Sequence, residues 1–163
     1  MKYATYNKLK PSAIPWLGDV PADWVVSRLK YTALRIDSGG TPETGDSSYW
    51  TTADDRNAIP WVSIGDMTQS TIVRKTERQI TEKAVQSKRL RILPRGTLLY
   101  SIYASIGKVA TLGVAATVNQ AILGIVPNES KSNQNFLRFW LIQMEQHLEL
   151  FSSSNTQDNL NAC

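Results

Sequence analysis

The middle of the chain alternates short apolar runs with turn residues, a pattern that is typical of short β-strands. Three apolar runs follow one another, at residues 97–101, 108–112 and 121–126. Proline, glycine, serine and asparagine separate these runs, and residues 117–120 are expected to form a turn. An earlier segment, residues 59–64, is also expected to be extended. The pattern therefore predicts a sheet that is built from short strands.

Helical spacing begins after Pro127, where the apolar period changes. The apolar positions that follow predict one amphipathic helix of about four turns. They are Phe136, Leu137, Trp140, Leu141, Met144, Leu148 and Phe151. A shorter helix is predicted over residues 81–86, because Thr81 stands at the N-cap position and good helix formers follow it.

The first third of the chain contains the strongest breakers of regular structure. Three prolines between residues 10 and 21 exclude a regular helix or a central strand, and they predict an ordered lead-in arm. A short strand at residues 24–26 and a helical turn through Leu29 and Leu34 are expected next. Glycine and serine clusters then predict a loop from residue 38 to residue 58.

Length and composition suit one compact globular domain of 163 residues, 42% hydrophobic and 20% charged. No apolar run reaches the roughly eighteen residues that cross a bilayer, and the N-terminus lacks the apolar block of a signal peptide. We therefore expect a cytoplasmic protein that does not enter a membrane. The expected division is an N-terminal arm (1–23), one α/β domain that includes the C-terminal helix (24–151) and a remainder (152–163).

Positive charge is concentrated in one part of the chain. The net charge is +4, but residues 74–95 hold eight Lys or Arg against two Glu, which is a local charge of +6. Such a block fits a surface that faces phosphates, because neutralising phosphates releases counterions and supplies affinity for any nucleic-acid sequence. A solvated helix face is the commoner explanation of such a block, so the charge alone does not establish nucleic-acid binding.

The residue types that carry catalysis are scarce in this sequence. Cys163 is the only cysteine and His147 the only histidine, so neither a thiolate cluster nor a histidine-based metal site can form. Glu129 and Lys131 have the spacing of a metal-dependent nuclease motif, but no Asp or Glu lies between Glu82 and Glu129 to complete it. No nucleotide-binding glycine loop and no fold that would bind S-adenosylmethionine are identified. The sequence therefore predicts a protein without catalysis of its own.

The order of several short sequence words is more specific than any one of them. Together they resemble the type I restriction-modification specificity subunits over residues 12–161. The words are 14–21 (IPWLGDVP), 38–42 (SGGTP), 59–62 (IPWV), 64–67 (IGDM), 93–97 (LPRGT), 105–108 (SIGK), 119–122 (NQAI) and 156–160 (TQDNL).

This resemblance implies a mixed α/β fold, in which a curved, barrel-like sheet forms a DNA target-recognition domain and a C-terminal amphipathic helix follows. It implies double-stranded DNA as the ligand, with modification (methyltransferase) subunits and an ATP-dependent restriction subunit as partners. S-adenosylmethionine, ATP and Mg²⁺ would belong to those partners, and this chain would need no cofactor. Members of the family continue beyond the last word, whereas this chain stops at Cys163. We therefore expect a fragment, a truncated product or half of a subunit.

Family members share these words while they read different DNA targets, so specificity is expected to lie between them. The polar segment 66–71 is predicted to be a loop, and three of the residues expected to contact bases lie in it, whereas two lie elsewhere between the words. The five residues are Thr68, Gln69, Ser70, Gln86 and Tyr103. The residues expected at phosphates or guanine edges are Arg74, Lys75, Lys88, Arg89 and Lys108.

A protein-interaction module is the main alternative. Such a fragment would assemble with a full-length partner and bind DNA weakly. An exposed apolar stripe at Phe136, Trp140, Met144 and Phe151 would favour it, whereas burial of that stripe against the sheet would make the stripe part of the core.

Overall fold

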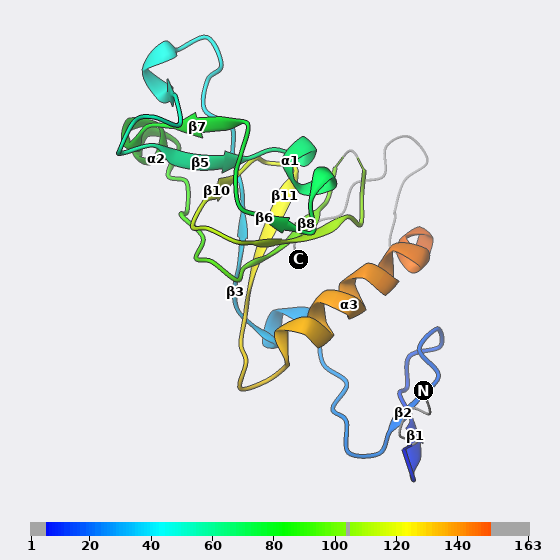
Figure 1. Cartoon of the computed structure of the whole chain (residues 1–163). Coiled ribbons are helices and arrows are strands. Elements are labelled where there is room, and N and C mark those ends of the chain that lie inside the picture. The colour runs from blue at the N-terminus through cyan, green and yellow to red at the C-terminus, as the bar shows by residue number, and fades with distance from the viewer. Residues whose placement is uncertain (1–5, 104, 151–163) are drawn as a thin grey trace.

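The computed structural model describes residues 6–103 and 105–150 (Figure 1). In this part the chain has a mixed α+β fold, with a two-stranded hairpin, a four-stranded sheet and a five-stranded sheet. Its α-helices are α1 (Ile64–Gln69), α2 (Glu82–Lys88) and α3 (Gln134–Met144). The mixed α/β class predicted from the sequence is confirmed.

The five-stranded sheet has the strand order β3-β11-β8-β9-β6, and only β9 and β6 pair in parallel. Successive residues of a strand point to opposite faces, so Leu98 and Tyr100 pack on the side of α3 whereas Leu99 packs between the two sheets. The three strands predicted in this region are confirmed. The strands are β3 (Ala33–Ser38), β6 (Ile72–Val73), β8 (Leu98–Ser101), β9 (Val109–Leu112) and β11 (Ile122–Pro127).

The four-stranded sheet has the order β10-β5-β7-β4, and α2 packs against it. The chain enters α2 directly from β7, and the Thr81 side chain caps the helix by accepting a hydrogen bond from the Ala84 N–H. This cap and the helix after it are confirmed. The strands are β4 (Trp50–Thr51), β5 (Ile59–Val62), β7 (Arg78–Ile80) and β10 (Thr117–Val118), the last in place of part of the expected turn at 117–120.

The barrel-like sheet expected from the family resemblance is wrong in its closure: apart from the hairpin of the arm, the described strands form two separate sheets and no closed barrel. The chain crosses repeatedly between the two sheets, among other places after β3 and between β10 and β11. There the Gly40 N–H, just after β3, donates to Val118 O of β10 (2.9 Å) and so links the two sheets. The bond from the Asn119 N–H to Val62 O (3.0 Å) continues the parallel pairing of β10 with β5 within the four-stranded sheet. A Cβ at Gly39 would lie 2.0 Å from Asn119 O, so only glycine fits this crossing.

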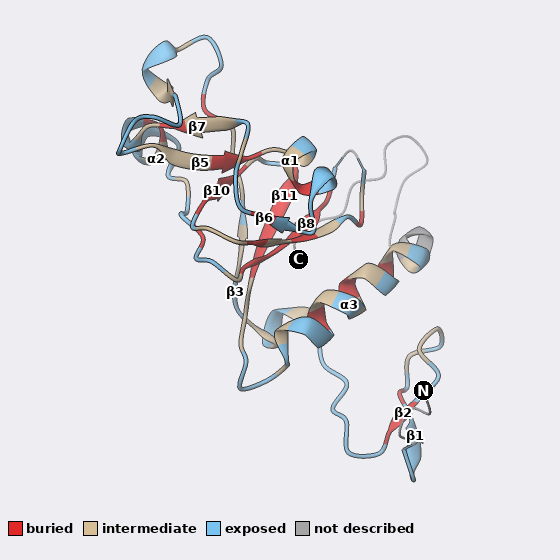
Figure 2. Cartoon of the chain, in the orientation of Figure 1, coloured by how far each residue is buried: buried red, intermediate tan, exposed pale blue. Residues whose placement is uncertain are grey.

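The C-terminal helix is shorter than predicted. α3 has eleven residues, and the chain continues as a 3₁₀-helix, η3 (Glu145–Leu150). Leu137, Leu141 and Met144 are buried, and the first two pack against the five-stranded sheet, whereas Phe136 remains exposed. Buried and exposed stretches accordingly alternate along α3 (Figure 2). The predicted stripe is therefore split between the core and the surface. Phe151 lies outside the described residues.

The predicted loop at residues 66–71 is wrong, because α1 occupies most of it. Ser63 and Asp66 form a capping box: the Ser63 side chain accepts from the Asp66 N–H, and the Asp66 carboxylate accepts from the Ser63 N–H. Buried Met67 anchors the helix in the core between the sheets. A reciprocal cap and one apolar anchor thus suffice for a six-residue helix.

The N-terminal arm forms a small hairpin of β1 (Leu9–Pro11) and β2 (Asp19–Pro21). It lies beside α3 and η3, where the Trp16 ring is 6.3 Å from Trp140 and 5.0 Å from His147, centroid to centroid. The strand expected at residues 24–26 is wrong, since this segment is irregular and exposed. Trp24 instead packs edge-to-face on Phe136 of α3.

The helical turn expected through Leu29 and Leu34 is reduced to a 3₁₀-helix, η1 (Leu29–Tyr31), and Leu34 lies in β3. Inside the expected loop at 38–58 the chain forms a second 3₁₀-helix, η2 (Ser47–Tyr49), and β4. None of the described helices is long and apolar enough to span a membrane. The expected remainder at 152–163 lies outside the described residues.

Candidate nucleic-acid interface

The basic block at residues 74–95 divides into stacked and unpaired cations. The Arg78 guanidinium carbon lies 3.4 Å from the Trp50 ring centroid and 5.7 Å from that of Trp61. The Lys83 ammonium donates to Ser48 Oγ (2.7 Å) and lies 5.3 Å from the Tyr49 ring centroid. These two cations stabilise the four-stranded sheet and the packing of Tyr49, just before β4, on α2 through cation–π contacts.

The other six cations of the block are exposed and form no salt bridge with any described residue. The two salt bridges in the described part of the chain join Arg35 to Asp37 and Lys108 to Glu145. Uncompensated positive charge on a surface attracts polyanions such as the DNA backbone. The six residues are Arg74, Lys75, Lys88, Arg89, Arg91 and Arg95.

Arg89 ends α2 in the left-handed conformation, with φ 51° and ψ 38°. Its N–H donates to Gln86 O and Val85 O, which satisfies the carbonyls at the end of the helix. Glycine is the usual residue at such a position, because a side chain there costs free energy.

The candidates around α1 differ in how many of their polar side-chain atoms already form hydrogen bonds within the protein. The Thr68 hydroxyl donates to Gly65 O (3.1 Å), and the Ser70 hydroxyl donates to Ile72 O (2.8 Å). Gln69 is exposed, and no described residue bonds its side-chain amide. Of the three, Gln69 is the residue whose side-chain donor and acceptor are both free of described partners, and a base edge can pair with both.

The remaining candidates lie on α2 and in the loop between β8 and β9. The Gln86 amide donates to the Glu82 carboxylate (3.2 Å), and the Lys108 ammonium lies 2.6 Å from the Glu145 carboxylate. Tyr103 is 37% exposed. The charge of Lys108 is thus partly balanced within the protein, which weakens its case as a phosphate contact.

The ten candidates form separate groups and not one cluster. α1 follows the end of β5, whereas α2 follows β7 at the level where Ile80 pairs with Ile59, the first residue of β5. The two helices therefore lie at opposite ends of β5 (Figure 1). The sequence could not reveal this separation, because it depends on how the strands pair.

Sequence reasoning passed over a second polar segment, residues 52–57, which connects β4 to β5. All six residues are exposed, and the segment contains Asp54, Arg56 and Asn57. The signal in the sequence is a run of four polar residues, 54–57, that stands shortly before a partly buried strand.

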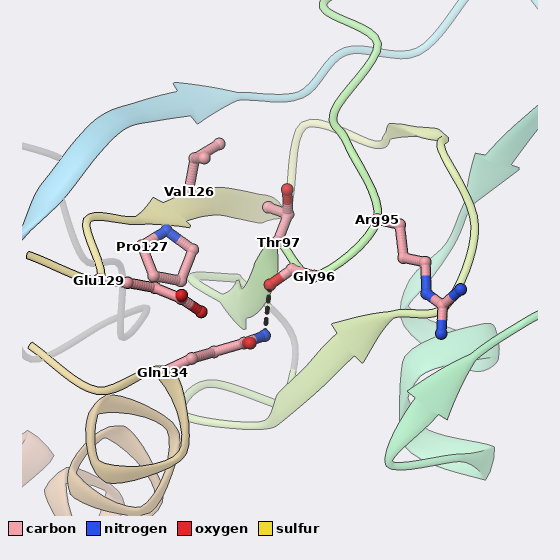
Figure 3. Close-up of a pocket in the computed structure, with 7 residues that line it drawn as sticks. All are labelled: Arg95, Gly96, Thr97, Val126, Pro127, Glu129 and Gln134. Atoms are coloured by element: carbon pink, nitrogen blue, oxygen red, sulfur yellow. Dashed lines mark hydrogen bonds between the residues drawn. The ribbon is translucent and has the colours of Figure 1, made fainter.

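A cavity of about 180 Å³ lies where the N-terminus of α3 meets β11 and the residues before β8. Figure 3 shows that the Gln134 side chain reaches across it to Gly96 O (2.6 Å) and that Arg95 points away. Small-molecule sites usually measure roughly 300–1,000 Å³. The cavity is therefore too small for a nucleotide cofactor. No group of three or more His, Cys, Asp or Glu among the described residues could hold a metal ion.

Comparison with known proteins identifies the family. Residues 21–162 match the type I restriction modification DNA specificity domain. The chain therefore belongs to this family.

Two relatives share about a third of their aligned residues with the chain. The Type I restriction enzyme MjaIX specificity subunit of Methanocaldococcus jannaschii is 33% identical over 143 residues, which cover 86% of this chain and 32% of that protein. The EcoR124I/EcoR124II specificity subunit of Escherichia coli is 33% identical over 96 residues, which cover 56% of this chain and 22% of that protein. The chain thus spans about a third of the length of the first relative.

Solved structures agree with the fold. The HsdS subunit from Thermoanaerobacter tengcongensis matches with a TM-score of 0.63 and 19% identity, over 88% of this chain and 33% of that one. A chain from a structure that describes complex assembly and conformational transition of the type I R-M system matches with a TM-score of 0.66 and 21% identity, over 88% of this chain and 32% of that one.

Proposed function

We propose that this chain is a DNA target-recognition domain, which selects the DNA sequence on which a type I restriction-modification complex acts. The observation that carries the proposal is the family match over residues 21–162. Six exposed cations without salt bridges to described residues supply the charge that binding to DNA needs. The predicted arm (1–23), recognition domain (24–151) and remainder (152–163) are kept as part of this proposal.

The chemistry of the complex would belong to the partners. Modification subunits would transfer methyl groups with S-adenosylmethionine, and a restriction subunit would use ATP and Mg²⁺ for cleavage. The purified chain with Mg²⁺, ATP and S-adenosylmethionine is then expected neither to cut nor to methylate DNA. Turnover that follows the protein through successive purification steps would contradict this part of the proposal.

The proposal is tested by selecting bound duplexes from a random library, with the chain in complex with the modification subunit of its own system. The expected result is enrichment of a short sequence motif. A complex of the modification subunit without this chain is the control, and it should enrich none. If the complete complex also enriches no motif, the proposed function is wrong.

A second candidate function, a protein-interaction module, is favoured by the distribution of exposed apolar side chains. Nine of the twelve large ones lie on the arm, in the segment 24–26 that follows it, on η1 and β3, or on the exposed side of α3; they are Tyr6, Leu9, Trp24, Val25, Val26, Tyr31, Leu34, Phe136 and Phe139. Large exposed apolar patches mark binding sites for partners. Replacing Val25, Leu34 and Phe139 together with Ser should weaken co-elution with the modification subunit, whereas Ile92→Ser, at an exposed residue elsewhere, should not.

A further inference from the structure

The loop of residues 52–57 between β4 and β5 is exposed and ordered at the same time. The Asp55 carboxylate accepts from the Thr51 hydroxyl (2.9 Å) and from the Asn57 N–H (2.9 Å). Two backbone hydrogen bonds close the loop, from the Asp55 N–H to Thr52 O (3.2 Å) and from the Ala58 N–H to Asp55 O (3.0 Å). The hydrogen bonds that the carboxylate accepts from the Asn57 N–H and the Thr51 hydroxyl hold the pKa of Asp55 below its ordinary value, so the carboxylate stays charged and keeps these partners.

The base of the loop is fixed by indole groups. The Trp61 indole N–H donates to Gly40 O (2.9 Å), and the Trp50 indole N–H donates to Glu43 O (3.1 Å). The Arg78 guanidinium stacks on Trp50 from β7, the strand that pairs with both β4 and β5. A loop on such a rigid base loses little conformational entropy on binding, which is what a recognition element requires.

The side chains at the tip are not engaged by the fold. No described residue forms a hydrogen bond or an ion pair with the side chains of Asp54, Arg56 or Asn57. Arginine pairs with guanine and asparagine with adenine through two hydrogen bonds each in the major groove, and a carboxylate accepts from the cytosine amino group. The two carboxylates, Asp54 and Asp55, make the loop unsuited to lie along phosphates. They are compatible with base edges.

The loop also lies beside a positively charged element. Ala58 joins the loop to Ile59, which pairs with Ile80 next to the start of α2. On the other side, η2 packs against α2, where Thr81 donates to Ser48 O (2.9 Å) and Lys83 donates to Ser48 Oγ. A duplex that meets the cations of α2 would therefore have this loop within reach of its groove.

We propose that the loop between β4 and β5 enters the major groove and that Arg56 and Asn57 read base edges, guanine by Arg56 and adenine by Asn57. This inference rests on the proposed DNA recognition. It adds a specificity element that lies apart from α1. The cations at the end of α2 would then hold the backbone beside that groove.

The test repeats the duplex selection with variants of the chain in complex with the modification subunit. Arg56→Ala and Asn57→Ala are each expected to lower discrimination at one motif position by about tenfold to a hundredfold. Arg56→Lys should lower it too, because lysine keeps the charge but loses the planar pair of donors. Arg28→Ala and Asn135→Ala change exposed residues of the same types elsewhere and should leave the motif intact. Thermal unfolding checks that every variant is folded.

The possible outcomes distinguish the assignment of the loop from the proposed DNA recognition. A wild-type motif that Arg56→Ala and Asn57→Ala both leave unchanged would overturn the loop assignment and leave DNA recognition standing. An equal loss of affinity on all duplexes would place these side chains at phosphates and would also overturn the assignment. A wild-type complex without any motif would overturn the proposed function, and the inference with it.

Discussion

Arg89 places charge where the backbone favours glycine, so its effects on stability and binding can be separated. In Arg89→Gly the left-handed residue at the end of α2 loses its steric cost, and we expect the free energy of unfolding to stay equal or to rise by up to about 1 kcal/mol. The same change should weaken DNA binding and flatten the log-log salt dependence by about one unit. Urea unfolding and binding titrations measure the two effects.

Arg89→Lys is the matched control for that change, because it keeps both the charge and the backbone cost. It should bind DNA close to the wild type. If Arg89→Gly retained full affinity and the full salt slope, Arg89 would have no role at the phosphates.

Gly39 is the residue on which the junction of the two sheets depends most. Its Cβ would lie 2.0 Å from Asn119 O and 2.2 Å from Val118 O, and backbone atoms cannot move aside as a flexible side chain can. Gly39→Ala is therefore expected to lower the free energy of unfolding by about 1–3 kcal/mol or more. Gly45→Ala is the control, since no atom lies within 4 Å of a Cβ at that position. Equal stability of the two variants in urea unfolding would show that the sheets do not meet as described.

The contact between β8 and η3 gives an element-scale prediction. Burial, together with the charge of Glu145, raises the pKa of Tyr100 to about 12 from an ordinary value of 10.0. Between these two pH values the unfolded chain releases the Tyr100 proton and the folded chain retains it, so stability falls as the pH rises. Tyr100→Phe removes this contribution, and its stability should fall less than that of the wild type between pH 8 and pH 11. Identical pH dependence in urea unfolding would contradict the described packing of Tyr100.

The strands β5, β8, β9 and β11 and the helix α2 could be predicted from the sequence because local signals carry them. The runs that became β8, β9 and β11 are mostly apolar and are bounded by turn residues, and Thr81 stands where an N-cap is needed. α1 was missed because its signal is short: one capping box and one buried residue, Met67. The expected strand at residues 24–26 failed because apolar residues do not pair without a neighbour, and Val25 is 86% exposed.

The candidate site could be predicted only as a list of residues, not as an arrangement. The sequence shows that residues 74–95 are basic, but it does not show that Arg78 stacks on Trp50 or that Lys108 pairs with Glu145. Both contacts join residues far apart in the chain. The roles of the ten predicted residues in DNA binding stay predictions.

Charge and apolar surface lie on different parts of the whole molecule. The cations of α2 flank the four-stranded sheet, whereas the arm and α3 lie on the far side of the five-stranded sheet (Figure 1). Replacing Arg74, Lys75, Lys88 and Arg89 together with Ala should weaken binding to every duplex. It should also flatten the log-log salt dependence by about one unit for each phosphate contact that is lost.

The control for this fourfold variant removes two exposed cations elsewhere, with Arg28→Ala and Lys131→Ala. It should leave both the affinity and the salt slope near their wild-type values. A fourfold variant that behaves like this control would mean that the basic block only solubilises the protein.

The most direct test of DNA recognition compares two affinities of the chain in complex with the modification subunit. One is for the duplex that carries the selected motif, and the other is for a duplex of the same composition with that motif scrambled. At a fixed salt concentration near physiological, we predict that the motif binds at least about tenfold tighter, because one bidentate base contact alone contributes about 1–3 kcal/mol. Equal affinities for the two duplexes would contradict the account.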